Sequence, residues 1–314
     1  MLLLCQRFIL YKLNLQIYMK IYDCFMFFDE EMLLDFRLNY LNKYVDNFVI
    51  VESAFTHSGQ KRELLFDIEK FKKYKDKICY IAIEQEPDNL QKIYEDDDKD
   101  KKNKKYILNA IKRENHQRNS INLGLKQAAD DDCVMISDID EIPNLEKNNL
   151  RSIKKKLIFF RQKIFYYKFN LYLETFDWHG TRACKKINLI SPQWLRNVKG
   201  RKYPFWRIDT LISKQKYTNI HFIDDGGWHF SYLKTPEAIE KKLKAYLHHR
   251  EYDIDPLGVE KIEQMIENRK AIYDLKVDMK IPKFKGSHIL KTVDIKLLPS
   301  YLQDNIDKYK EWMD

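Results

Sequence analysis

The chain has 314 residues, of which 44% are hydrophobic and 14% aromatic, so it can build a sizeable core and wholesale disorder is excluded. The formal net charge of +9 favours an anionic partner, such as a nucleotide, nucleic acid or lipid headgroup, or else reflects a solvated lysine-rich surface. The five cysteines are widely spaced and include no Cys-x-x-Cys pair, which argues against a cysteine zinc site.

The N-terminal part of the chain alternates between strand-like and helix-like patterns. Apolar runs predict strands over 21–28, 48–51 and 78–83, and the run at 48–51 is expected to be buried. Between them, apolar positions at helical spacing predict helices over 29–44 and 66–75. This β-α-β-α-β order is typical of the nucleotide-binding half of an α/β protein.

The middle of the chain is less regular. Residues 85–104 are charge-dense, which is typical of an exposed or disordered loop. A helical pattern then covers 105–129, and an apolar strand is expected over 134–136. A basic helix is predicted over 145–156, and the aromatic stretch 157–172 predicts a hairpin that leaves the parallel sheet.

The remaining residues predict short strands and then helices. Residues 174–231 are rich in tryptophan and indicate short strands and loops. Thr235 and Pro236 suit the start of a helix, as cap and first helical residue, and this helix should run to about residue 248. A second helix is expected over 258–274, followed by a lysine-rich tail over 276–314 with a short helix at 301–312.

Two acids follow the strand at 134–136 directly. Asp138 and Asp140 stand at its carboxyl end, where open α/β sheets bind ligands, and Pro143 stops the strand from continuing. Two crowded carboxylates repel each other, and a hard divalent cation would remove that cost and hold phosphate oxygens. The alternative is an ordinary acidic turn. Glu141 is then either a partner of the pair or an acid in the first turn of a helix, and we favour the latter.

Three other groups of residues have both a functional and a structural interpretation. Gly226 and Gly227 allow positive φ angles and close ligand approach, with Trp228 as a face for a sugar or base and His229 as a metal ligand, or they form a turn before a core strand. The basic residues at 248–250 could simply interact with the negative end of a helix dipole. Glu52 ends a buried strand, so it should reach the same sheet edge as the two aspartates.

Seven stretches, in the same order, resemble glycosyltransferase family 17, the family of the bisecting β-1,4-mannosyl-glycoprotein 4-β-N-acetylglucosaminyltransferase. They are KIYDCFMFFDE at 20–30, VDNFVIVES at 45–53, THSG at 56–59, ENHQRNSI at 114–121, ISDIDEIP at 136–143, GWHFSY at 227–232 and HHREY at 248–252. The resemblance covers about residues 20–275. It implies a GT-A-like, Rossmann-like α/β fold with a mixed central sheet and a helical C-terminal part, preceded by an extension over 1–19.

The resemblance also implies a chemistry: inverting transfer of a sugar, N-acetylglucosamine, from UDP to a glycan hydroxyl with the help of Mn²⁺ or Mg²⁺. The metal ligands it implies are Asp138, Asp140 and His229. The implied nucleotide-pocket residues are Glu52, Arg118, Asp138 and Trp228. For the catalytic base we favour Asp225, while Asp224 and Glu251 stay open as alternatives, and His249 has no assigned role.

The expected partners are a sugar nucleotide and a glycan or glycoconjugate acceptor, without nucleic acid. The apolar residues 2–10 are too short and too interrupted to predict a stable transmembrane anchor. We therefore expect a cytoplasmic or peripherally membrane-associated protein, and a Golgi-type luminal location only if the first 17 residues act as an anchor. Three alternatives remain: an inactive family member, a haloacid-dehalogenase-type phosphatase using Asp138 and Asp140, and a metal-independent nucleic-acid binder.

Overall fold

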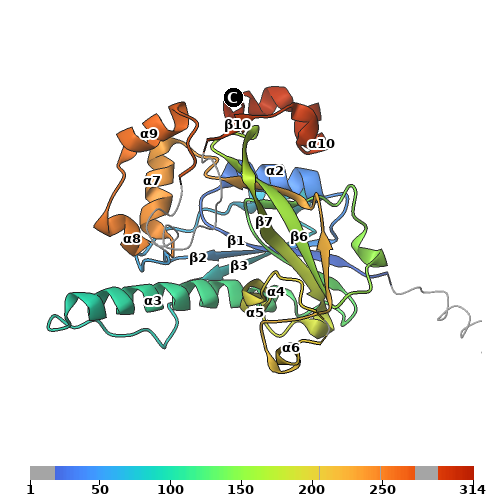
Figure 1. Cartoon of the computed structure of the whole chain (residues 1–314), viewed down its shortest axis with the longest axis horizontal. Coiled ribbons are helices and arrows are strands. Elements are labelled where there is room, and N and C mark those ends of the chain that lie inside the picture. The colour runs from blue at the N-terminus through green and yellow to red at the C-terminus, as the bar shows by residue number, and fades with distance from the viewer. Residues whose placement is uncertain (1–17, 205, 248, 273–288) are drawn as a thin grey trace, which may run out of the picture.

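The computed structural model describes residues 18–204, 206–247, 249–272 and 289–314, without the side chains of residues 175–177, 211 and 251. The ten described strands form one mixed sheet. Eight of them follow the order β3-β2-β1-β4-β7-β6-β9-β5, while β10 pairs with β7 and β8 pairs with β6 (Figure 1). The strands are β1 (Ile21–Phe27), β2 (Asn47–Ser53), β3 (Ile78–Ile83), β4 (Cys133–Asp138), β5 (Glu141–Pro143), β6 (Leu157–Tyr166), β7 (Leu171–Lys185), β8 (Ile220–Ile223), β9 (Gly227–Ser231) and β10 (Lys291–Thr292).

The strands and the first helix of the predicted N-terminal α/β half are confirmed, but the helix expected over 66–75 is only the 3-10 turn Ile68–Tyr74. Strands β3, β2, β1 and β4 pair in parallel, while β7 pairs with β4 in the antiparallel direction and so begins the mixed half of the sheet. Met26 of β1 is level with Asp138, and its neighbour Phe27 is level with Glu52. Both acids therefore lie at the same carboxyl edge of the parallel strands, as the sequence predicts.

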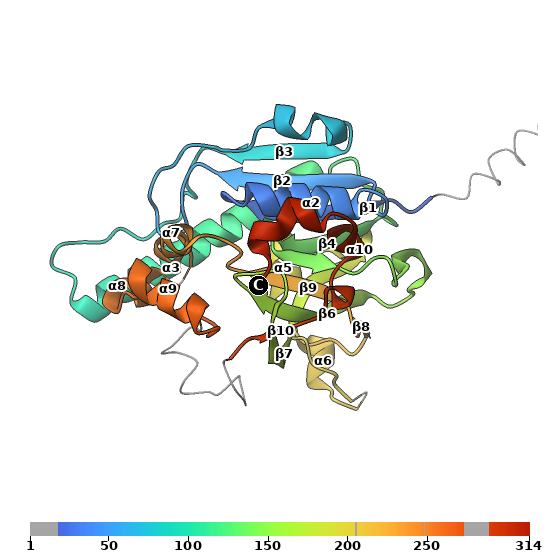
Figure 2. The same ribbon diagram turned by 90° about the horizontal axis from the view of Figure 1, so that it is seen from above.

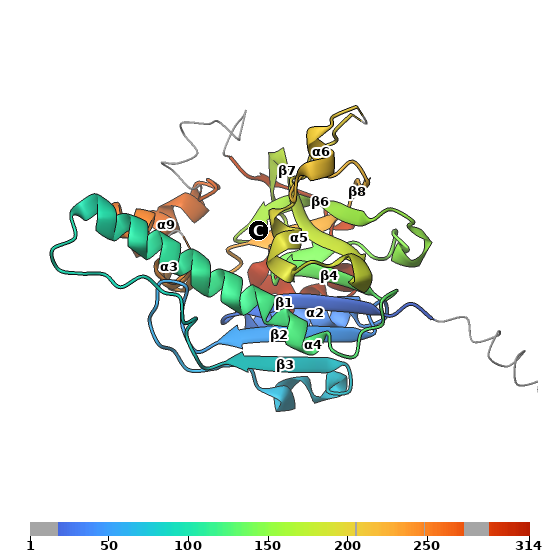
Figure 3. The same cartoon turned by 90° about the horizontal axis from the view of Figure 1, so that it is seen from below.

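Strand β1 shows why the sheet is buried on both faces. Because successive side chains point to opposite faces, Ile21 and Phe25 join one core cluster, whereas Tyr22 and Cys24 join another. Helix α2 (Glu31–Leu41) covers the first face together with α10 (Ser300–Asp304), as Figure 2 shows. The opposite face is covered by α3 (Lys99–Asn119), α4 (Ile121–Gly124) and α5 (Pro192–Asn197), as Figure 3 shows.

The other helices are short or lie beside the sheet. Helix α7 (Pro236–Ala245) packs against α9 (Val259–Glu267) and α8 (His249–Ile254), and α6 (Asp209–Ile212) projects from the body of the protein. The 3-10 turns are Ile68–Tyr74, Leu150–Ser152, Lys186–Asn188, Ile295–Leu297 and Ile306–Trp312. Among the described residues, none of these helices has the length and apolarity needed to span a bilayer.

Two predicted helices differ from the structure in instructive ways. Helix α3 starts at Lys99, earlier than expected, because the Asp98 carboxylate accepts a hydrogen bond from the Lys101 backbone N–H at 2.7 Å and caps it. The basic helix predicted over 145–156 is wrong: only a 3-10 turn forms there. The amide of Asn148 donates to a backbone carbonyl four residues earlier, and Asn149 caps the short turn, so side chains compete with the helical bonds.

The C-terminal segment is part of the core. Thr235 caps α7 and Pro236 is its first residue, as predicted, although α7 ends at residue 245. The described part of the lysine-rich tail, 289–314, adds β10 to the sheet and buries Leu302 and Tyr309 against the cluster that contains α2. The predicted N-terminal extension, 1–19, lies outside the described residues except for its last two positions.

Candidate functional site

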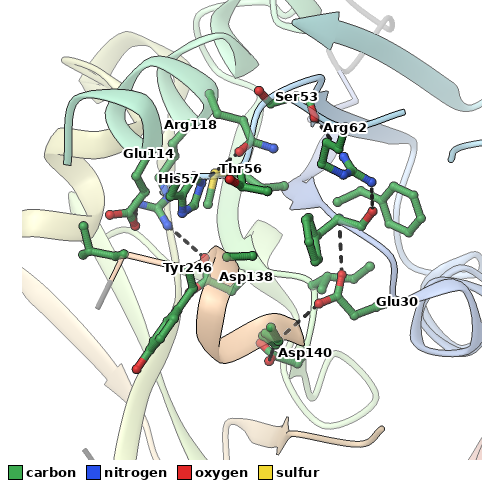
Figure 4. A pocket seen from close by; sticks show the side chains of 18 of the residues that line it. Glu30, Ser53, Thr56, His57, Arg62, Glu114, Arg118, Asp138, Asp140 and Tyr246 are labelled. Carbon is green, nitrogen blue, oxygen red and sulfur yellow. Dashed lines mark hydrogen bonds and ion pairs between the residues drawn. The ribbon is translucent and has the colours of Figure 1, made fainter. Parts of the chain in front are cut away.

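A cavity of about 260 Å³ opens at the carboxyl edge of β1, β2 and β4 (Figure 4). Asp138 ends β4, the chain turns through Ile139 and Asp140, and β5 then runs back along β9. Both aspartates line this cavity, which we call the edge pocket. Its lining residues are Met26, Phe27, Phe28, Glu30, Ser53, Phe55, Thr56, His57, Arg62, Glu114, Gln117, Arg118, Asp138, Ile139, Asp140, His229, Ser231, Tyr232, Lys242, Ala245, Tyr246 and Leu247.

Asp138 is held by two arginines. Its carboxylate oxygens lie 3.0 Å from Arg118 Nη2 and 2.8 Å from Arg196 Nη2, and the side chain is 37% exposed toward the pocket. Burial raises the pKa of Asp138, but Arg196 and Arg118 outweigh it and lower that pKa to about 2. The carboxylate is therefore ionised at any physiological pH. The prediction that Arg118 lines this pocket agrees with its position.

Asp140 faces a histidine and a lysine. His229 Nε2 lies 3.5 Å from one carboxylate oxygen and Lys242 Nζ lies 3.3 Å from the other. These contacts are longer than the 2.7–2.9 Å of a strong charge-assisted hydrogen bond. Burial raises the pKa of Asp140, while Lys242 and His229 together bring it below its usual range. Lys242 also reaches Glu30 at 3.4 Å, so this lysine bridges two pocket carboxylates.

Glu141 is a buried partner of the aspartate turn and does not begin a helix, which corrects the preferred sequence interpretation. Its carboxylate accepts a hydrogen bond from the Asp138 backbone N–H at 2.9 Å and from Trp178 Nε1 at 2.6 Å. Arg196 Nη1 completes the set at 2.7 Å. Because Arg196 binds Asp138 as well, it connects α5 to both ends of the turn.

A buried ion pair, which no sequence pattern predicted, holds the backbone of the aspartate turn. Arg37 of α2 and Asp23 of β1 are both fully buried and form a two-pronged pair at 2.8 and 2.6 Å. The remaining Arg37 nitrogen, Nη1, donates to the backbone carbonyls of Asp138, Ile139 and Glu141, at 3.3, 3.2 and 2.7 Å. The guanidinium therefore fixes the backbone that presents the two aspartates.

Glu52 lies behind the pocket wall. It is fully buried and accepts hydrogen bonds from the backbone N–H groups of Leu65 and Phe66 and from the Tyr80 hydroxyl, and it pairs with Arg62 at 2.9 Å. These contacts position the 54–66 loop, part of which forms the pocket wall, and Glu52 itself does not line the pocket. Glu52 lies at the predicted edge of the sheet. Packing, however, directs its side chain to these contacts and not into the pocket.

His57 does line the pocket. Its Nε2 lies 3.0 Å from the Gln117 side-chain oxygen, and burial lowers the pKa of the imidazole. Gln117 in turn donates to the carbonyl of Val51 in β2 at 3.0 Å. The imidazole therefore joins β2, the 54–66 loop and α3 at the pocket wall.

Several predicted site residues lie elsewhere. Trp228 is buried in the core, where Nε1 donates to the Leu297 carbonyl at 2.7 Å. Asp225 lies outside the pocket lining, pairs with Lys147 at 3.2 Å and contacts Lys163. The alternative base Asp224 is 76% exposed and pairs with Arg161.

The glycine pair has a structural role. Gly227 has φ of +130°, and a Cβ there would lie 2.1 Å from the Ile142 carbonyl oxygen, so the pair allows β9 to approach β5. No other residue type could keep this pairing without moving a strand. Two further candidates belong to α8: the side chain of Glu251 lies outside the described residues, and His249 is buried with Nδ1 3.0 Å from the Tyr246 carbonyl.

The pocket has the donor types of a divalent-cation site, but side-chain nitrogens already contact its carboxylate oxygens. Asp138, Asp140 and His229 supply oxygen and nitrogen ligands, and His229 Nδ1 is buried without a partner among the described residues. However, each carboxylate oxygen of the pair already faces an arginine, lysine or histidine nitrogen. Within the described part of the chain, no three acidic, histidine or cysteine side chains are grouped to hold a metal. An ion bound to Asp140 would have to displace Lys242.

The comparison with known families extends beyond the stretches recognised in the sequence. The description "Glycosyltransferase family 17" belongs to the family whose sequence pattern matches residues 4–313, which is nearly the whole chain. No curated protein sequence matches it at a significant level. The match includes the β1–β2 edge, the aspartate turn and the helices around the edge pocket, as well as the C-terminal segment that packs on α2. The chain therefore belongs to glycosyltransferase family 17, and the protein is a glycosyltransferase.

Proposed function

We propose that the protein transfers N-acetylglucosamine from UDP-N-acetylglucosamine to a glycan hydroxyl with inversion at the anomeric carbon, using a GT-A-like arrangement. The observation that supports this most directly is the edge pocket itself. Ionised Asp138 and Asp140 face Arg118, His229 and Lys242 at the carboxyl edge of a parallel sheet, which is where open α/β sheets bind nucleotides.

The charges of the pocket suit a sugar nucleotide diphosphate. Arg118 and Lys242 bring positive charge to the pocket from two different helices, α3 and α7, and can each exchange a carboxylate contact for a phosphate oxygen. Such cations stabilise the charge that grows on the departing nucleotide. Phe27 and Phe28 supply apolar surface, and Ser53 supplies a hydroxyl, for the base and sugar.

Asp138, Asp140 and His229 are the residues that would hold Mn²⁺ or Mg²⁺. When bound, the ion would offset the negative charge on the diphosphate. If such an ion displaced Lys242 from Asp140, the lysine would still have Glu30 as a partner, at 3.4 Å. Its positive charge would therefore remain paired. Without a bound ion, Lys242 offsets the negative charge of Asp140.

The donor class can be tested directly by thermal shift. We expect UDP-N-acetylglucosamine with Mn²⁺, at about 100 times its Kd, to raise the Tm by roughly 5 °C, since such binding adds about 2.7 kcal/mol. GDP- and CMP-sugars at the same concentration serve as matched controls and should give a much smaller shift. Removing the cation with EDTA should reduce the shift for the UDP-sugar. An equal shift for all three donors would contradict the donor assignment.

We infer that Glu114 accepts the proton of the acceptor hydroxyl. Among the carboxylates that line the pocket, Asp138 and Asp140 are assigned to the donor, and Glu30 lies between Lys234 and Lys242. Burial raises the pKa of Glu30, but these lysines lower it to about 2, which makes it a weak base. Glu114 of α3 pairs with one cation, Arg118, at 2.8 Å.

Replacing Glu114 with glutamine should lower sugar transfer by roughly 10²–10⁴-fold, because general base catalysis typically contributes that much. Donor binding, measured by the thermal shift above, should change little. The variant Asp225→Asn should transfer sugar at close to the normal rate, because Asp225 lies outside the edge pocket. The reverse pattern, with loss of transfer only in Asp225→Asn, would restore the base assignment made from the sequence.

A further inference from the structure

The segment 199–216 projects from the sheet and carries exposed apolar side chains. It follows α5, contains α6 and stands away from the body of the protein in Figures 1 and 3. Trp206, Ile208 and Ile212 are 67%, 73% and 85% exposed, which is unusual for side chains of this size. The segment is held at its base, where the Lys199 N–H donates to the Gln215 carbonyl at 2.7 Å and Trp194 Nε1 donates to the Lys214 carbonyl.

The charge of the same segment is strongly positive. Between residues 199 and 216 the sequence has six basic residues and one acidic residue. The acidic one, Asp209, pairs with Arg207 at 2.7 Å and with Lys216 at 2.7 Å. The exposed basic residues of the segment are Lys199, Arg201, Lys202, Arg207 and Lys214.

We propose that the 199–216 segment docks the protein on the surface of an anionic lipid bilayer. Apolar and amphipathic side chains such as tryptophan partition into the headgroup region, while flanking lysines and arginines bind acidic lipids. A protruding segment can insert its tip without the rest of the fold meeting the bilayer. A protein partner would need a complementary acidic surface around an apolar socket, whereas an anionic membrane offers both features over any area.

The proposal is independent of the assigned sugar transfer. The edge pocket lies at the carboxyl ends of β1, β2 and β4, whereas α6 lies beyond α5 in Figure 3. None of the residues between 199 and 216 lines the edge pocket. Substitutions in the segment therefore test membrane docking without altering the residues proposed to act on the sugar.

The test is co-sedimentation of the full chain with vesicles of phosphatidylcholine alone or with added phosphatidylserine. We expect binding to the anionic vesicles only. The triple variant W206S/I208S/I212S should bind at least about tenfold more weakly, and so should R201Q/K202Q/K214Q, since each basic residue near an anionic surface adds measurably to binding. Circular dichroism establishes that each variant is folded.

A matched control separates docking from the overall positive charge. The variant K72Q/K73Q/K75Q removes the same charge from exposed lysines in and next to the 3-10 turn at the β3 edge, which Figure 2 shows on the opposite side of the molecule from α6. It should retain the binding of the unmodified protein. Equal weakening in this control, or normal vesicle binding by W206S/I208S/I212S, would overturn the proposal. Self-association that is lost in the apolar variant, without vesicle binding, would also overturn it and assign the surface to a second copy of the chain.

Discussion

The variant Asp140→Asn is expected to lose at least about a hundredfold in turnover, which is the usual cost of removing one electrostatic contact to a developing charge. Asparagine has the same shape but no charge. It would leave His229 and Lys242 facing a neutral amide in a site where they are 3.5 and 3.3 Å from a carboxylate. It would also remove a ligand that a divalent cation needs.

The fold of this variant should survive, because Lys242 keeps Glu30 as a partner and the amide oxygen can still accept a hydrogen bond. The measurement is release of UDP from UDP-N-acetylglucosamine in the presence of Mn²⁺, which does not require the acceptor to be identified. The control Asp131→Asn makes the same change at an exposed aspartate that contacts Lys185, and should leave turnover unchanged. Normal turnover in Asp140→Asn would falsify the role assigned to the aspartate turn.

Replacing Arg37 with methionine is expected to lower the free energy of unfolding by about 3–5 kcal/mol, because breaking a buried ion pair leaves an uncompensated charge. Asp23 would then be an unpaired carboxylate in a fully buried position. The carbonyls of Asp138, Ile139 and Glu141 would each lose the Nη1 donor. The total free energy of unfolding of a typical domain is only about 5–15 kcal/mol. This loss is therefore the largest single effect on stability that we expect.

Urea unfolding measures the change in the free energy of unfolding. The control Arg151→Met removes an arginine that is 30% exposed and pairs with Asp46 at 3.1 Å, so it should cost no more than about 1 kcal/mol. The double variant D23L/R37M removes both charges and should be more stable than Arg37→Met alone. A cost below about 1 kcal/mol for Arg37→Met would show that the buried pair does not anchor the aspartate turn.

Much of the fold was predictable because buried positions appear in the sequence as regular patterns of apolar residues. The unbroken apolar runs at 21–28, 48–51 and 78–83 predicted strands that form where expected; β1 and β2 are buried, whereas the edge strand β3 is only half-buried. The helix predicted over 145–156 does not form, because two asparagine side chains form hydrogen bonds with nearby backbone groups and so compete with helical hydrogen bonds. The spacing of hydrophobic residues does not indicate such competition.

The candidate site was predictable only in part. The aspartates could be assigned to the sheet edge because a strand and the turn after it are neighbours in sequence. Arg196 and Lys242, however, come from 58 and 102 residues away. No pattern near the aspartates indicates these partners, and nothing in the sequence indicates that Arg37 pairs with Asp23 in the core.

The sequence by itself determined the family, the order of strands and helices in the N-terminal half, and the edge where two carboxylates meet. Only the tertiary structure decided which side chains turn toward that edge. Glu52, Trp228 and Asp225 are not among the residues that line the pocket, whereas Glu30, Glu114 and Lys242 line it. The physical reason is that the spacing of apolar residues indicates whether a residue is buried. The side chains that it contacts depend instead on how helices and strands distant in sequence pack together.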